Sequence, residues 1–166
     1  MSEMTLLAHE LEAHLRLMIE KEKRSGDFLL ASVIQDCLVY NLHGHVGHAE
    51  LDHMSRYASE LAVKVALQSL HRDPATIRET TRGVMHALTN LGVNPMVAAI
   101  SVTFGTVQCL GPSLTPLDTA AVIRGVAQAA DELGVGDEPC RVSEHLAWCM
   151  SGPGMYTMDP DEPVAG

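Results

Sequence analysis

The segment from His43 to His53 concentrates side chains that bind metal ions. We single out five of its eleven residues as candidate metal ligands: His43, His45, His48, Asp52 and His53. Imidazole is a common ligand for zinc, nickel, copper and iron, and the glycines at 44 and 47 let a loop bring several ligands together. On a helix that starts near His48, His48 and Asp52 are four residues apart and point the same way. The spacing predicts a site for a transition metal such as zinc.

The predicted core of the helix after this segment lies on its other side. Leu51, Met54 and Ala58 recur at helical spacing, roughly opposite Asp52 and His53. A metal at the segment would therefore face solvent or another subunit, and a symmetric dimer could close the site. The alternative interpretation is that these histidines are solvated residues at a helix start.

Two known metal motifs resemble parts of this segment. His43-Gly-His-Val-Gly-His48 resembles the HxHxDH signature of the metallo-β-lactamase fold, with Gly47 in place of the aspartate. The resemblance implies a metal-dependent enzyme, but a long helical run before the motif does not fit that α/β sandwich. Glu50-Leu-Asp-His53 resembles one Glu-x-x-His element of a di-iron bundle, and the sequence has no second such element.

A third resemblance concerns His86. The stretch that follows it, Leu91-Gly-Val-Asn-Pro95, is similar to the corner after the haem-binding helix of sensor globins. The resemblance implies His86 as a haem ligand, at a spacing offset from the usual one. Only two Phe and one Trp are available to line a haem. A globin-like sensor domain is accordingly an alternative function.

The charge balance bears on the class of partner. Lys and Arg number 11 against 21 for Asp and Glu, which gives a formal net charge of -10. Because phosphates would be repelled and no Lys or Arg stripe is present, neither nucleic acid nor an anionic membrane is an expected partner. The acidic N-terminus lacks the pattern of a secretory signal, so we expect a cytoplasmic protein.

Two further features favour a compact intracellular domain. No Asp, Glu, Lys or Arg occurs between Arg82 and Asp118. The densest apolar part, 95–110, would be a helix of about 24 Å, shorter than the roughly 30 Å of membrane hydrocarbon, so a core helix is expected. No CxxC or zinc spacing appears among the four cysteines, which predicts free, mostly buried thiols in a reducing compartment: Cys37, Cys109, Cys140 and Cys149.

Periodicity and capping signals predict an all-α, single-domain bundle of about six or seven helices over 1–150, with a flexible tail over 151–166. The helices are expected at about 5–24, 28–42, 48–70, 74–91, 95–110, 115–133, and from 137 or 143 to 150. Acid-to-base pairs at i,i+4 support the first and third helices: Glu12–Arg16, Glu20–Arg24, Asp52–Arg56 and Glu60–Lys64.

Two of these helices carry a more specific expectation. Apolar residues cover most of the circumference of 28–42, which predicts a central, buried helix. In 95–110, Ile100, Val102 and Phe104 alternate with small polar residues as in a strand, although a proline start and a long apolar run favour a helix.

No motif marks a catalytic nucleophile or a phosphate loop. The sequence therefore favours a non-enzymatic binding or regulatory helical domain, expected to be a homodimer. Apolar faces of the uncharged region 82–118 would form its interface, or a pocket for a small apolar ligand or a protein partner. The alternatives are a metal-dependent enzyme or metal-handling protein that uses His43 to His53, and the globin-like sensor.

Overall fold

A computed structural model describes residues 3–25, 28–44 and 48–151, apart from the side chains of 48 and 49. Those residues form seven α-helices and one 3₁₀ turn, with no strand among them. The elements are α1 (Glu3–Glu22), α2 (Leu30–Leu42), α3 (His48–Ser69), α4 (Pro74–Asn90), α5 (Pro95–Leu110), η1 (Gly111–Ser113), α6 (Pro116–Leu133) and α7 (Glu138–Met150). The predicted all-α bundle is confirmed, and the α/β sandwich of the metallo-β-lactamase resemblance is excluded for this part of the chain. The expected tail lies, after Ser151, outside the described residues.

Side-chain caps form at the predicted starts of three helices, whereas Asp137 before α7 makes no side-chain cap bond. Asp73 accepts a hydrogen bond from the Thr76 backbone N–H at 2.8 Å, and Asn94 accepts one from a backbone N–H in the first turn of α5 at 2.9 Å. Thr115 and Asp118 form a reciprocal capping box at the start of α6, with bonds of 3.1 and 3.0 Å. These bonds satisfy N–H groups that have no partner within the helix, so local sequence sets where these three helices begin.

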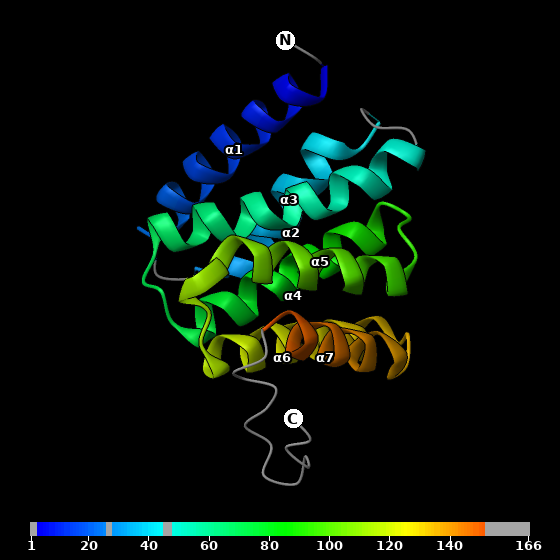
Figure 1. The fold of residues 1–166 in the computed structure, drawn as a ribbon. Coiled ribbons are helices and arrows are strands. Elements are labelled where there is room, and N and C mark those ends of the chain that lie inside the picture. The colour runs from blue at the N-terminus through cyan, green and yellow to red at the C-terminus, as the bar shows by residue number, and fades with distance from the viewer. Residues whose placement is uncertain (1–2, 26–27, 45–47, 152–166) are drawn as a thin grey trace, which may run out of the picture.

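The helices stack in successive pairs, as Figure 1 shows. α2 packs on α4, and α3 packs on α5. α4 and α5 pack in turn on α6 and α7. α1 packs on α2 and α3 and lies across them, at the side of the stack away from α6 and α7. Its buried face is one stripe: Ala8, Leu11, Leu15 and Ile19. Met4, Leu7 and Met18 flank this stripe and are partly buried against the same core.

Glycines allow the stacked helices to approach closely. A Cβ added to Gly83 of α4 would come within 2.5 Å of the Ala31 carbonyl oxygen in α2. One added to Gly105 of α5 would meet a carbonyl of α3 at 2.6 Å, and one on Gly125 of α6 would overlap the Thr81 hydroxyl of α4. Three of the layer-to-layer contacts therefore depend on the absence of a side chain.

The uncharged region forms core, and residues 95–110 are helix throughout. The segment Pro95–Ser113 is long and apolar enough to cross a membrane, yet half of its most apolar window is buried inside the molecule. α5 packs against α3, α4, α6 and α7. Its only exposed positions are Ile100 and Gln108. Little of α5 is left for the interface or pocket that its composition suggested.

Three expectations need correction. α2 is not buried all round: Tyr40 is 75% exposed, and Leu29, directly before the helix, is 67% exposed. Among the described residues only Cys37 is fully buried of the four free thiols, and Cys149 is exposed. The predicted pairing of Glu60 with Lys64 is also wrong, because Lys64 Nζ donates to Glu12 Oε1 of α1 at 2.8 Å.

Side chains of the other predicted ion pairs also contact residues other than the predicted partner four positions away. Arg16 does approach Glu12, at 4.0 Å, but it also donates to the Gln68 side chain of α3 at 2.8 Å. Glu20 forms an ion pair with Lys23, three residues later in the chain, at 2.8 Å. The Arg56 guanidinium lies over the Phe104 ring, 4.3 Å from its centroid. Contacts between helices thus decide where most of these side chains lie.

Candidate binding groove between α1 and α2

The structure describes only part of the predicted metal segment. His43, Asp52 and His53 are exposed, and for Asp52 and His53 this agrees with the helix geometry that placed them away from the core. His45 lies outside the described residues, and so does the side chain of His48, whose backbone begins α3. Within the described part of the chain, no group of three or more His, Cys, Asp and Glu side chains is placed to hold a metal. The zinc-type site therefore stays a prediction.

His86, the residue behind the globin resemblance, belongs to an ion-pair network between α4 and α6. Its Nε2 lies 2.9 Å from Glu132 Oε1. Arg82 donates to both carboxylate oxygens of Glu132, at 2.7 and 2.6 Å. These Arg82 bonds, and secondly His86, lower the pKa of Glu132 to about 2. The imidazole nitrogen that a haem iron would need is already engaged.

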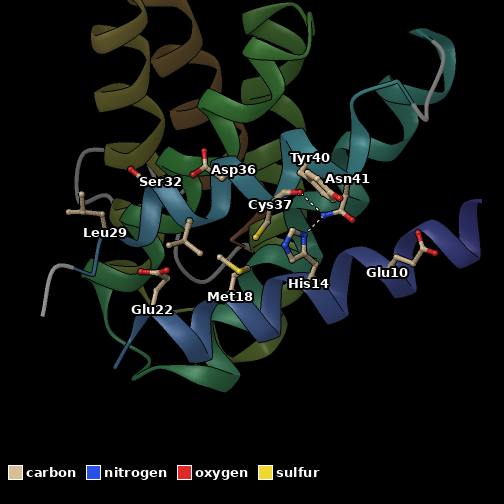
Figure 2. Close-up of a pocket in the computed structure, with 11 residues that line it drawn as sticks. Glu10, His14, Met18, Glu22, Leu29, Ser32, Asp36, Cys37, Tyr40 and Asn41 are labelled. Atoms are coloured by element: carbon tan, nitrogen blue, oxygen red, sulfur yellow. Dashed lines mark hydrogen bonds between the residues drawn. The ribbon is translucent and has the colours of Figure 1, made fainter. Parts of the chain in front are cut away.

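A cavity of about 790 Å³ lies between α1 and α2. We call it the α1–α2 groove. One wall is a stripe of α1 residues spaced four apart, which a helix places on one face: Glu10, His14, Met18 and Glu22. The other wall is the outer side of α2 with Leu29 before it: Leu29, Ser32, Val33, Asp36, Cys37, Tyr40 and Asn41. Figure 2 shows the two walls facing each other.

A hydrogen-bonded cluster joins the two walls at the middle of the groove. The Asn41 amide nitrogen lies 2.8 Å from His14 Nδ1 and donates to the Cys37 carbonyl at 2.7 Å, as the dashed lines in Figure 2 show. Because a carbonyl oxygen can only accept, the Asn41 atom bonded to it must be the amide nitrogen. The same nitrogen lies beside His14 Nδ1, so it must donate to Nδ1 as well. The Tyr40 ring meets the His14 ring edge to face at 5.4 Å between centroids. This cluster holds α1 at a fixed place on α2.

The groove combines an apolar interior with an acidic border. Its apolar lining residues are Leu29, Met18, Val33 and Cys37, and its charged ones are Glu10, Glu22 and Asp36. Among the described residues, no Lys or Arg lines it. Of the seven large apolar side chains that are exposed in the described residues, four lie on α1, on α2 or directly before α2: Leu6, Leu17, Leu29 and Tyr40. Leu29 and Tyr40 line the groove itself, whereas Leu6 and Leu17 do not.

Cys37, His14 and Asn41 are residue types used together in thiol catalysis, but their arrangement does not activate the thiol. Burial, and secondly the charge of Asp36, raises the pKa of the Cys37 thiol to about 11. The thiolate is the nucleophile, so at neutral pH this cysteine is inert. His14 Nδ1 accepts from Asn41, and no hydrogen bond between His14 and Cys37 is recorded in the described residues. The groove has the properties of a binding surface.

Sequence reasoning missed this groove. It predicted a central, buried helix at 28–42 and did not single out His14. The contact between His14 and Asn41 spans 27 positions, and neither residue type is unusual. One signal was present: the stripe Glu10, His14, Met18 and Glu22 runs beside the core stripe of the same helix and mixes apolar with acidic residues.

Comparisons with family models, with curated proteins and with solved structures gave no match to this chain. The function of the groove is therefore argued from its own residues.

Proposed function

We propose that this protein is a non-enzymatic binding domain whose α1–α2 groove accepts a cationic, amphipathic helix of a protein partner. The observation that carries the proposal is the lining by described residues: an apolar interior with three carboxylates and no basic side chain. Apolar anchors of a helix would displace water from the interior. Lysine or arginine side chains on its flanks would meet Glu10, Glu22 and Asp36.

The dimensions of the groove suit such an occupant. Glu10 and Glu22 are twelve residues apart on α1, which corresponds to about 18 Å, or roughly three helical turns. An amphipathic helix of that length presents three or four apolar anchors at i, i+3 or i+4, and i+7. Met18 lies between the two glutamates and supplies a flexible, polarizable surface that adapts to different anchors.

A second copy of the chain is a less suitable occupant for electrostatic reasons. Each copy carries a formal net charge of -10, and its own groove is bordered by carboxylates. The homodimer expected from the sequence is accordingly an outcome that the experiment below must distinguish. The four free thiols are consistent with a reducing compartment, and we propose the cytoplasm as the location.

Binding of synthetic peptides, followed by fluorescence anisotropy, tests the proposal. Three labelled peptides of about 18 residues are compared: a leucine/lysine amphipathic helix, its leucine/glutamate counterpart, and a leucine/lysine scramble without an apolar face. We expect the first to bind at least about tenfold more tightly than the other two, and to weaken as salt is raised. Equal binding of the amphipathic peptide and its scramble would show only nonspecific attraction to an acidic protein and would contradict the proposal.

Light scattering on the same sample decides between the other occupants. A monomer that binds the basic amphipathic peptide supports the proposal. A dimer whose dissociation is required before the peptide binds would assign the groove to a second copy. If none of the peptides binds and a neutral apolar fluorophore does, the groove belongs to a small apolar ligand instead.

A further inference from the structure

A second cavity, of about 310 Å³, lies between the N-terminal half of α1 and the start of α3. It is separate from the α1–α2 groove, with which it shares no lining residue. Its lining residues are Met4, Thr5, Ala8 and His9 from α1, and His53, Met54 and Tyr57 from α3. The cavity is thus lined by two imidazoles and two thioethers, and each helix contributes one of each kind.

All four side chains line this one cavity, although neither the α1 pair nor the α3 pair shares a single face of its helix. On α1, Met4 and His9 are five residues apart and border the same end of the helix. On α3, His53 is exposed whereas Met54, its neighbour in sequence, is 2% exposed and belongs to the main core cluster. The Met54 sulfur is therefore held by core packing, while the imidazoles stay accessible from solvent.

The donor types select among metals. Thioether sulfur and imidazole are soft or borderline ligands, and thioether donors favour Cu(I). Zinc sites use three or four donors drawn from Cys, His, Asp and Glu. In the described part of the chain no such group of three exists, so His9 and His53 have no third donor of that class. Within the described ranges, no Lys or Arg lines the cavity to repel a cation.

We propose that His9, His53 and the sulfurs of Met4 and Met54 form a binding site for one Cu(I) ion. Two neutral imidazole nitrogens bind the ion from opposite helices, and one or both thioethers complete its coordination. The ion keeps its oxidation state, and the site holds it without a reaction. This proposal does not depend on the α1–α2 groove, because none of the four residues lines it.

The site also changes how the sequence prediction is interpreted. Of the predicted metal ligands whose side chains the structure describes, His53 shares this cavity with another histidine, and that histidine comes from α1. Asp52, its neighbour in sequence, does not line the cavity. The predicted ligand set joined residues that are close in sequence, whereas this one joins two helices.

Anaerobic titration of the full chain with Cu(I), in competition with a chromophoric Cu(I) chelator, measures the affinity and the stoichiometry. We expect one Cu(I) per chain, and a loss of at least about tenfold in affinity for His9→Ala and for His53→Ala. Met54→Leu keeps the apolar volume and removes the sulfur, so it tests the thioether without opening a core cavity. A weaker Cu(I) complex in Met54→Leu, with circular dichroism unchanged, is expected.

The rival Cu(I) ligand is Cys149, which is exposed and lies 3.7 Å from His145 Nε2 on α7. Cys149→Ser and His145→Ala are therefore the matched controls, and we expect neither to change the affinity of the proposed site. If Cys149→Ser abolishes Cu(I) binding and His9→Ala does not, the ion belongs to the thiol and the proposal is wrong. Unchanged affinity in a His9→Ala, His53→Ala double variant would overturn it equally.

Discussion

Gly83 of α4 lies so close to Ala31 of α2 that a β-carbon on the glycine would come within 2.5 Å of the Ala31 carbonyl oxygen. Two backbones are therefore in direct contact at this crossing. Because α2 forms one wall of the α1–α2 groove, this contact sets the depth at which that wall is seated on the core. The outer side of α2 then remains free to face α1 and solvent.

Gly83→Ala tests this contact. An alanine inside a helix normally stabilises it by up to about 1 kcal/mol relative to glycine, but here its β-carbon meets backbone that cannot turn away. We expect the clash to prevail and to lower the free energy of unfolding by about 1–3 kcal/mol, measured by urea denaturation. Asn90→Ala, an exposed position of the same helix, is the control. A Gly83→Ala variant as stable as the wild type would show that α2 and α4 can separate at little cost.

The cluster at the middle of the groove predicts one tautomer of His14. Because the Asn41 amide nitrogen donates to Nδ1, the neutral ring must carry its proton on Nε2. Nitrogen-detected NMR of the imidazole should therefore show the Nε2–H form. Asn41→Ala removes the donor and is expected to allow both tautomers and to cost about 1 kcal/mol of stability. A ring protonated on Nδ1 in the wild type would mean that the two walls are not joined as described.

The lowered pKa of Glu132 predicts how the stability of the folded protein depends on pH. This pKa is lowered from an ordinary value of 4.5 to about 2, first by Arg82 and then by His86. A carboxylate whose pKa falls on folding stabilises the folded state above its unfolded pKa, and this contribution is lost as the pH drops through the folded pKa. The loss should therefore fall between about pH 4.5 and pH 2.

Urea denaturation at neutral pH and near pH 3 measures this contribution. Glu132→Gln is expected to be less stable than the wild type at neutral pH, and the difference should shrink at the acidic end. Glu144→Gln, at an exposed position of α7, is the control. A difference between Glu132→Gln and wild type that stays constant over this range would contradict the pairing.

Replacing Asp118 is expected to lower the stability of the protein more than replacing an exposed carboxylate does. Asp118 is 5% exposed, it accepts from the Thr115 backbone N–H at 3.0 Å, and it binds Arg72 at 2.8 Å. Asp118→Ala removes both bonds, so we expect a loss of about 2 kcal/mol or more in thermal or urea unfolding. Asp131→Ala, on the exposed side of α6, should change stability by less than about 0.5 kcal/mol. Equal effects of the two variants would rule out a role for the capping box.

Much of the fold was predictable because its signals are local. Capping residues such as Asp73 act within one turn of the chain, so the start of α4 was predicted at Pro74, where the structure has it. The i,i+4 ion pairs were mostly wrong because a long side chain such as Lys64 reaches a neighbouring helix as easily as its own next turn. The close glycine crossings could not be predicted, since an isolated helix gives no reason for Gly83.

The candidate sites were predictable only where ligands are close in sequence. The segment from His43 to His53 was noticed because it holds four histidines. The prediction included His53 but not His9, with which His53 shares a cavity. The α1–α2 groove was missed because His14 and Asn41 meet only after α1 has folded across α2. A further obstacle was α2 itself, whose apolar composition indicates burial although one side lines an open groove.

The central claim is that the α1–α2 groove binds a cationic amphipathic helix, and two matched leucines test it most directly. Leu29 borders the groove and is 67% exposed, while Leu117 lies at the start of α6 and is 68% exposed. Each is changed to lysine, and the affinity for the leucine/lysine peptide is measured by fluorescence anisotropy. Leu29→Lys should weaken binding at least about tenfold, and Leu117→Lys should leave it within about twofold of wild type. Equal affinities in the two variants would contradict the claim.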